Sequence, residues 1–397
     1  MKVVRTASVK LDLDPQNFQI LLNTIKLYTQ SYNFVCSVGF EKNITNGITL
    51  HKLTYNTTRE YLPSQLSISS RAQATESLLS LSTKKRKNPS KSFKCPNSKQ
   101  MSIRLDKNSH TIWFDKQIVS ILSCEGRLRL PFTINPYFKQ FINWKHSSAQ
   151  LVLRNKKFFL MVQFEKDVED LPKTGKYLGI DRGIRKLAVC SNNKFYSGGQ
   201  VRRTCQKYLK LRKKLQECGS RSAKRHLCRV SGKEKRFKSD VNHQISKNIV
   251  SMLNPGDTIV LESLSGIRNK RLRKKQRAEI NSWNYLQLEQ YLTYKAMAKS
   301  VHIEHVDARY TSQRCSKCGH IARSNRKSQS GFRCTKCNFT LNADLNAARN
   351  IVVKYLDSKS FFETCESKGV EVNQPNVRPV FLGRPAKNKP LPSGRSY

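Results

Sequence analysis

The feature that most constrains this chain of 397 residues is its excess of positive charge. It carries 74 Lys or Arg against 27 Asp or Glu, which gives a formal net charge of +47 and a pI near 10.2. Such a charge repels itself in a compact fold unless a polyanion supplies counter-charge, so it favours nucleic acid as the partner. With 38% hydrophobic residues the chain can still build cores, so it is not a disordered basic tail.

The apolar runs, the first residues and the cysteine spacing together predict an intracellular protein with reduced thiols. The longest apolar run, FFLMVQF at 158–164, is far below the roughly 18 residues of a spanning helix, so no membrane is expected as a partner. The first residues contain no secretory leader, so we expect an intracellular protein: cytoplasmic and nucleoid-associated if prokaryotic, nuclear if eukaryotic. Of the 12 cysteines only four share a regular spacing, which favours reduced thiols and one metal site over disulfides.

The N-terminal half reads as a β domain that carries a helical insertion. An alternating stretch ending at Asp14 predicts a strand, and Pro15 can begin a helical region that runs to about residue 83. The stretch TKKRKNPSKSFK, residues 83–94, breaks the helical pattern. Short β-rich runs recur between turn residues over 100–166, which predicts a small barrel or sandwich.

Strands alternating with helices in the C-terminal half predict an α/β domain. The run YLGIDRGIRKLAVCS, from Tyr177 onward, predicts one mostly apolar strand. Residues 202–238 hold 15 Lys or Arg and predict a basic helical hairpin. Further along we expect a separate helix over 242–254, a buried strand over 256–263, a basic loop over 268–277, a helix over 285–300, a strand over 302–307, and a disordered tail beyond about 368.

Three carboxylates occur where burial would be costly. Asp181 interrupts the apolar run YLGI and Glu262 ends the apolar run TIVL, so each loses much hydration unless a positive charge compensates. Asp344 follows Asn342, which can cap the helix that begins there. Taken singly, each acid could pair with a Lys or Arg. Together they favour two Mg²⁺ ions, because such ions need several hard oxygen ligands from separate elements.

Four cysteines form the pattern C-x2-C-x15-C-x2-C: Cys315, Cys318, Cys334 and Cys337. Two such knuckles supply the four thiolates of a tetrahedral Zn²⁺ site. A site filled by four protein ligands leaves no position for water, so the expected zinc is structural.

Basic runs at 84–87, 202–238 and 268–277 indicate contacts with phosphates, although a charge run is often only a solvated surface. The candidate contacts are Lys207, Lys210, Arg212, Lys213, Lys214, Arg225, Arg271 and Arg273. Trp113 and Trp283 lie in apolar patterns, which favour packing over base stacking.

The ordered set GIDRGI, IVLES, YTSQRCSKCGH and CTKCNFTLNADLNAARNI resembles the TnpB family of transposon-encoded RNA-guided nucleases, which is related to Fanzor proteins and compact type V CRISPR effectors. The resemblance is dense over about 176–355, whereas 1–170 match only in layout. It implies a RuvC-like acid triad on a split RNase H fold, with Asp181, Glu262 and Asp344 holding the catalytic Mg²⁺ pair.

The resemblance also implies a guide non-coding RNA and a double-stranded DNA target beside a short motif. Arg182 departs from the family pattern, and it could contact the scissile phosphate or only the surface.

The expected architecture is α/β and β multidomain: an RNase H-like (RuvC) nuclease domain with a zinc-ribbon insertion, plus an N-terminal wedge β-barrel with a helical recognition insertion. The expected domains are the wedge barrel at 1–14 and 91–172, the recognition insertion at 15–90, the nuclease domain at 173–310 and 341–365, the zinc ribbon at 311–340, and a basic disordered tail at 366–397. The expected activity is RNA-guided, Mg²⁺-dependent DNA cleavage. A guided DNA-binding regulator, a compact type V CRISPR effector and a strand-transfer transposase remain alternatives, and the oligomeric state is left open.

Overall fold

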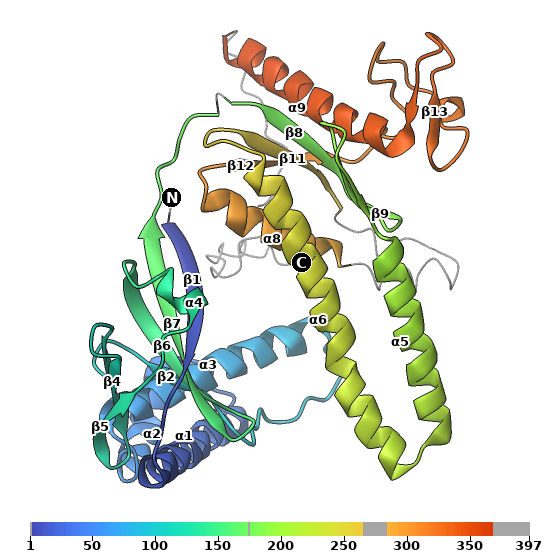
Figure 1. The fold of residues 1–397 in the computed structure, drawn as a ribbon. Helices are drawn as coiled ribbons and strands as arrows, with labels where there is room; N and C mark the ends of the chain where they lie inside the picture. Colours follow the sequence, from blue (N-terminus) through green and yellow to red (C-terminus); the bar gives the residue numbers. More distant parts are fainter. Residues whose placement is uncertain (1, 174, 265–283, 368–397) are drawn as a thin grey trace, which may run out of the picture. The chain divides into compact units, whose positions relative to one another are not determined.

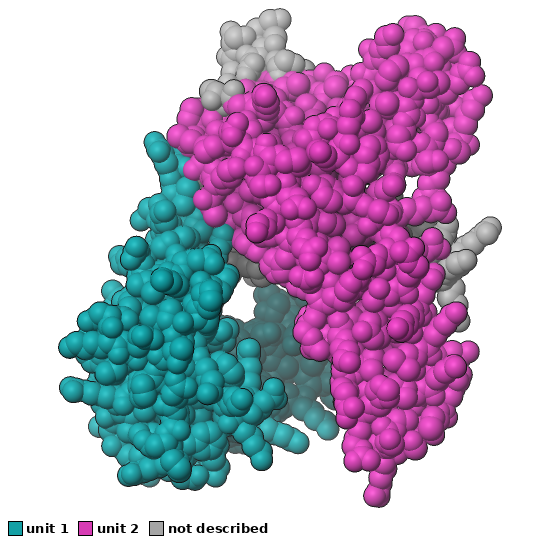
Figure 2. Space-filling view, viewed as in Figure 1, with its two compact units in different colours: residues 1–170 teal, residues 171–397 magenta. Residues whose placement is uncertain are grey.

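The computed structural model describes residues 2–173, 175–264 and 284–367, with side chains up to residue 359 (Figure 1). The chain divides into two compact units, 1–170 and 171–397 (Figure 2). Two expectations lie outside the described residues: the basic loop with Arg271, Arg273 and the nearby Trp283, and the disordered tail. In the described ranges no helix is both long and apolar enough to cross a bilayer.

The strands of the first unit form two antiparallel sheets. One sheet has the order β1-β7-β6-β2 and the other β3-β4-β5, and neither closes into a barrel within the described residues. The strands are β1 (Lys2–Lys10), β2 (Ile103–Leu105), β3 (His110–Trp113), β4 (Ile118–Ser123), β5 (Gly126–Pro131), β6 (Lys145–Arg154) and β7 (Lys157–Asp167). Trp113 is 36% exposed, so its expected packing is wrong: the period of two along β3 buries Ile112 and leaves Trp113 on the outer face.

The helices of the first unit are α1 (Pro15–Glu41), α2 (Gly47–Arg59), α3 (Ser64–Lys87) and the short α4 (Pro136–Lys139). The start of α1 at Pro15 is confirmed, and the Asn17 backbone N–H donates to Asp14 Oδ1 over 2.6 Å as its cap. The expected break at TKKRK is wrong, because α3 continues to Lys87. Lys and Arg are good helix formers and suit the negative end of the helix dipole.

The second unit is built on a five-stranded mixed sheet, in the order β10-β9-β8-β11-β12. Its strands are β8 (Tyr177–Asp181), β9 (Lys186–Cys190), β10 (Phe195–Ser197), β11 (Thr258–Ser263) and β12 (His302–Asp307). Pairing is parallel for β8, β11 and β12 and antiparallel for β8, β9 and β10. The expected single strand from Tyr177 is therefore wrong: the chain turns after Asp181, at Gly183, and returns as β9.

Helices cover both faces of this sheet (Figure 1). The helices of this unit are α5 (Gly199–Cys218), α6 (Arg221–Ser251), α8 (Tyr285–Met297) and α9 (Ala343–Ser367), of which α5 packs against α6 and extends away from the sheet. Ile249 of α6 and Leu292 of α8 pack with Ile180 and Leu261 on one face. Ile351 of α9 packs with Val260 on the other. The sheet is thus the centre of a three-layer α/β arrangement.

The basic hairpin is confirmed as α5 and the first half of α6. Gly219 takes a left-handed φ of 61° at the turn, and Ser220 caps α6 by accepting the Ala223 backbone N–H over 3.1 Å. The expected separate helix over 242–254 is wrong, because α6 is one helix of 31 residues. No Gly or Pro lies between the basic stretch and that segment, so nothing ends the helix.

Candidate active site and metal centre

Asp181 and Glu262 end two neighbouring parallel strands. The register pairs Ile180 of β8 with Leu261 of β11, so each acid is the residue that directly follows this pair on its own strand. Ile180 and Leu261 belong to the core beneath α6 and α8. Because successive side chains of a strand point to opposite faces, Asp181 and Glu262 lie on the face covered by α9.

Asp344 comes to the same face at the first turn of α9. The Asn342 side-chain Oδ1 accepts the backbone N–H groups of Asp344 and Leu345 over 3.1 and 3.3 Å, so the predicted cap is confirmed. The helix lies close on β8, since a Cβ on Gly179 would stand 2.1 Å from the Ala348 carbonyl oxygen.

Burial raises the pKa of all three carboxylates. Burial raises the pKa of Asp181 to about 7, and the charges of Glu262 and Asp344 add to that rise. Burial also raises the pKa of Glu262 and of Asp344. Arg326 opposes the rise at Asp181 and at Asp344. Burial thus disfavours the charged form of all three carboxylates, and a divalent cation bound between them would favour it.

Two of the acids have protein partners. Thr311 Oγ1 donates to Glu262 Oε1 over 2.5 Å, and Arg326 Nη2 donates to Asp344 Oδ1 over 3.4 Å. Their oxygens are not gathered as tightly as the cysteine sulfurs, which form the one close cluster of metal-ligand atoms in the described part of the chain. The donors are hard carboxylate oxygens on three separate elements, a set that fits Mg²⁺.

Arg182 does not lie at the surface, so the alternative of a surface residue is wrong. Its side chain is 1% exposed. It donates from Nη1 to Glu289 Oε2 over 2.5 Å and from Nη2 to the Glu262 carbonyl oxygen over 2.6 Å. The sequence alone could not predict this ion pair, because Glu289 lies 107 positions away from Arg182.

The four cysteines gather as predicted, with their sulfurs within 4.8 Å of one another. Sγ–Sγ distances are 3.7 Å for Cys315–Cys337 and 3.6 Å for Cys318–Cys334. Sulfurs about 2.3 Å from a tetrahedral Zn²⁺ would be about 3.8 Å apart, whereas a disulfide would need about 2.05 Å. The cluster therefore fits zinc and is not a pair of disulfides.

The backbone repeats the same turn at both knuckles. Gly319 and Asn338, each directly after the second cysteine of its knuckle, take left-handed φ values of 74° and 53°. The 3-10 turn η2 (Arg323–Asn325) and the strand β13 (Gly331–Arg333) lie between the two knuckles, and the strand β14 (Thr340–Asn342) follows the second. Asn is the residue that best tolerates this conformation after Gly, which is a signal that sequence reasoning missed at Asn338.

Buried asparagines join the cysteine cluster to α9. Asn346 Nδ2 donates to the Arg314 carbonyl over 2.8 Å, and Asn350 Nδ2 donates to the Thr311 carbonyl over 2.8 Å. Both asparagines are at most 1% exposed. The segment that carries Thr311 and Cys315 is thereby tied to the helix that carries Asp344, and sequence reasoning predicted neither asparagine.

The predicted phosphate contacts on the hairpin differ in their surroundings. Lys207, Lys210, Lys213, Lys214 and Arg225 are exposed. Arg212 instead forms an ion pair with Glu234, which also accepts from Lys238 over 2.7 Å. This pairing ties the two arms of the hairpin together and leaves the exposed cations available for a polyanion.

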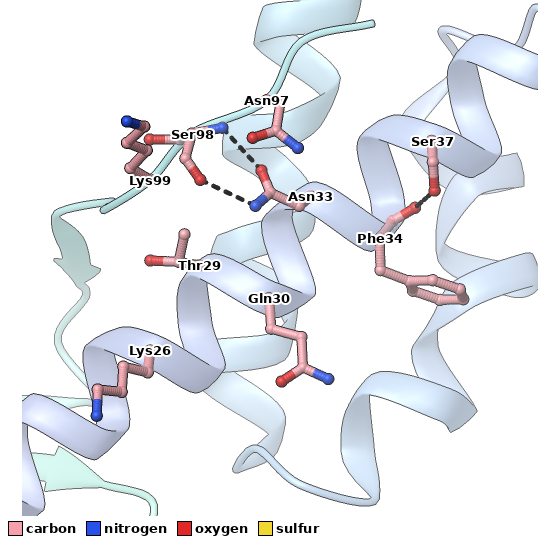
Figure 3. Close-up of a pocket in the computed structure, with 9 residues that line it drawn as sticks. All are labelled: Lys26, Thr29, Gln30, Asn33, Phe34, Ser37, Asn97, Ser98 and Lys99. Carbon is pink, nitrogen blue, oxygen red and sulfur yellow. Dashed lines mark hydrogen bonds between the residues drawn. The ribbon is translucent and has the colours of Figure 1, made fainter.

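The first unit contains an open pocket of about 680 Å³ beside α1 (Figure 3). The Asn33 side chain closes one wall by exchanging two hydrogen bonds of 2.9 Å with the Ser98 backbone. Lys26, Gln30 and Lys99 also line the pocket. Phe34 lines it as well, so the lining mixes cationic, polar and apolar groups.

Comparison with known proteins shows which proteins this chain resembles. The Cas12f1-like TNB domain model matches residues 285–351, and the model OrfB_IS605, described as a probable transposase, matches 159–264. The TnpB-like protein MJ0751 of Methanocaldococcus jannaschii is 27% identical, over 62% of this chain and 94% of that protein. The chain is thus similar to a TnpB-like protein over more than half of its own length.

Relatives of the Cas12f type match as well. A CRISPR-associated endodeoxyribonuclease Cas12f1 of Sulfoacidibacillus thermotolerans is 41% identical over 30% of this chain. The chain spans about half or less of the curated relatives it matches first, with shares of 28%, 48% and 53%. A solved Cas12f1–sgRNA–target DNA complex shares the fold, with a TM-score of 0.56 and 16% identity over 84% of this chain and 81% of that chain.

Proposed function

We propose that this chain is an RNA-guided DNA endonuclease that cleaves target DNA beside a short adjacent motif. The observation that carries the proposal is that Asp181, Glu262 and Asp344 share one face of a mixed sheet, where burial and then the charges of Glu262 and Asp344 raise the pKa of Asp181. The Cas12f1 relative is named an endodeoxyribonuclease, which supports DNA as the substrate. The solved Cas12f1 complex with sgRNA and target DNA supports a guide RNA as the partner.

The residues of this chain would divide the work as follows. Asp181, Glu262 and Asp344 would hold two Mg²⁺ ions, which when bound would activate the attacking water and stabilise the leaving 3′ oxygen. Thr311 would orient the Glu262 carboxylate, and the Asn342 cap would hold Asp344 at the helix start. The exposed lysines of the hairpin would bind the nucleic-acid backbone, and base pairing to the guide would choose the sequence.

In this proposal the second unit is a RuvC-like nuclease domain with a zinc ribbon at 311–340, and the first unit is a wedge domain with a helical recognition insertion. A zinc ion held by the four cysteines would fix the segment that carries Thr311 against α9.

Elemental analysis tests the zinc site directly. The purified chain is expected to carry about one zinc ion, because four thiolates complete one tetrahedral site. Cys337→Ser is expected to lose that zinc, whereas Cys228→Ser, at an exposed free cysteine on α6, is expected to keep it. Equal zinc content in both variants would contradict the assignment.

The guide RNA could be encoded by a transposon or by a CRISPR array, since relatives of both the TnpB and the Cas12f type match this chain. We favour a transposon-encoded guide because the TnpB-like relative matches along 94% of its own length. Sequencing the RNA that co-purifies with the chain decides between them: RNA from the flanking 3′ end of the gene supports a transposon guide, and repeat-spacer RNA supports a CRISPR guide.

The decisive experiment offers plasmid targets to the chain purified with its RNA in Mg²⁺. The parent is expected to cut. Asp181→Ala, Glu262→Ala and Asp344→Ala are expected to lose cleavage while they keep RNA and target binding, because each removes a metal ligand and leaves the basic surface intact. Cleavage by all three variants at the parental rate would refute the proposal.

Two other activities give distinct results in the same assay. A guided DNA-binding regulator would bind the target with its RNA, and the parent would leave the plasmid uncut. A strand-transfer transposase would bind transposon ends after the RNA had been digested.

A further inference from the structure

We propose that Arg182 is a positioning residue for the second acid: it holds the Glu262 backbone in place across the end of the β8–β11 ladder and so sets the metal affinity of the acid site. This inference rests on the proposed function. It follows from four features of the structure.

The first feature is the end of the parallel ladder. Pairing between β8 and β11 stops at Ile180 and Leu261, whereas β11 continues to pair with β12 through Glu262 and Ser263. The Glu262 carbonyl therefore has no partner from the β8 backbone. Arg182 Nη2 supplies one, over 2.6 Å, and in effect extends the ladder by one residue.

The second feature is the side of the sheet on which Arg182 lies. Asp181 faces α9, so the next residue points to the opposite face, where α8 packs. There Nη1 donates to Glu289 Oε2 of α8 over 2.5 Å. The Arg182 guanidinium thus connects α8, on one face of the sheet, to the backbone of Glu262, whose carboxylate lies on the other face.

The third feature is the anchor that holds the guanidinium. Glu289 Oε1 lies 3.0 Å from Nε2 of His305 on β12, so the carboxylate has a partner on each oxygen. Burial alone would raise the pKa of Glu289, but His305 and Arg182 outweigh it and lower that pKa to about 2. Glu289 stays ionised and keeps the fork of Arg182 in one orientation.

The fourth feature separates this role from contact with substrate. Arg182 is 4% exposed, and its Nε is buried without a hydrogen-bond partner. Both terminal nitrogens are already committed within the protein. No donor of the side chain faces solvent, so the residue cannot bind a phosphate without leaving its site.

The test compares Arg182→Lys with the matched control Arg185→Lys, at an exposed arginine three positions away. A lysine has one ammonium and cannot reproduce the fork that serves both Glu289 and the Glu262 carbonyl. For each RNA-loaded particle, Mn²⁺ binding is measured by the EPR signal of free Mn²⁺ in the absence of target, together with the Mg²⁺ concentration that half-saturates cleavage. Arg182→Lys is expected to weaken both by about tenfold or more, while Arg185→Lys matches the parent.

A second variant separates positioning from folding. Arg182→Met with Glu289→Met removes the buried pair as a unit, which is expected to keep the thermal midpoint near that of the parent. The Glu262 carbonyl still loses its donor, so the weaker Mn²⁺ binding is expected to persist. A stable double variant with parental Mn²⁺ and Mg²⁺ dependence would overturn the inference.

The two proposals fail in different ways. If the parent cuts, Asp181→Ala does not, and the Arg182 variants behave as the parent, only the positioning role is wrong. If Asp181→Ala binds Mn²⁺ and cuts as the parent does, the acid site itself is wrong, and the positioning role falls with it.

Discussion

Gly179 shows how a single residue sets the approach of the helix that carries Asp344. It lies in the middle of β8, and the alternation of the strand turns it toward α9. An added Cβ would stand 2.1 Å from the Ala348 carbonyl oxygen and 2.8 Å from Val352 Cγ2. The nearest atom is helix backbone, which cannot rotate away as a side chain can. Glycine is therefore what allows α9 to lie this close to the first acid.

Replacing Gly179 by Ala is expected to push α9 away from β8. Forcing one methyl group into a packed contact costs about 1–3 kcal/mol, or about 3–10 °C in the thermal midpoint of a unit of this size. Differential scanning fluorimetry measures the shift. Gly199→Ala is the matched control, because its nearest atoms are side-chain atoms at 3.6 and 3.9 Å. If both variants melt together with the parent, the close approach is wrong.

At the scale of elements, the basic hairpin depends on few internal contacts. None of the residues of α5 is buried, and the ion pair of Arg212 with Glu234 links the two arms of the hairpin. A helical pair with so little apolar contact gains much of its stability from whatever covers it. A polyanion that pairs with its exposed lysines fits this requirement.

The salt dependence of nucleic-acid binding tests the hairpin. Replacing Lys207, Lys210, Lys213 and Lys214 together by Ala removes up to four phosphate contacts, which is expected to lower the slope of log K against log salt by about 3. Fluorescence anisotropy with a labelled RNA–DNA heteroduplex measures it. Lys107→Ala with Lys116→Ala, both exposed in the first unit, is the comparison. A parental slope in the fourfold variant would exclude the hairpin from the interface.

Clusters of Lys and Arg do not end the helices in which they lie. The KKRK segment continues α3 to Lys87, and the basic stretch continues without a break through α6 to Ser251. Lys and Arg carry a high helix propensity, and helices end where a turn residue or a capping group ends them. The strand from Tyr177 shows the converse, because Gly183 lies in a turn within an otherwise apolar run.

At the scale of the whole molecule, each unit has its own hydrophobic cores. The cluster that contains Tyr28 and Phe164 lies within the first unit, and the cluster that contains Ile249 and Leu261 lies within the second. A unit of this length buries enough apolar surface to fold without further stabilisation. The first unit is therefore expected to fold by itself.

Residues 1–170, expressed alone, are expected to unfold in one cooperative thermal transition followed by circular dichroism. Phe164 is fully buried and has ring contacts with Phe114, Phe138 and Phe141, so Phe164→Ala is expected to cost about 3–5 kcal/mol. Tyr137→Ala, at a residue that is 52% exposed, is the control. A fragment without a cooperative transition would show that this unit needs the rest of the chain.

The local pattern of the sequence was enough to single out the candidate groups. An acid at the end of an apolar run, an asparagine before an amphipathic helix and two paired cysteines are features of neighbouring residues. They predicted a helix cap and two metal sites without knowledge of the fold. The approach of the cysteine sulfurs and the helix cap at Asn342 followed those patterns.

Only the tertiary structure decided which side chains support the acids. Arg182 reaches Glu262 and Glu289 across 80 and 107 positions of sequence, and Thr311 reaches Glu262 across 49. Apolar periodicity is a local property, whereas the partner of a buried polar group depends on which strands and helices become neighbours. That choice follows from the order of the strands in the sheet, which no run of adjacent residues encodes.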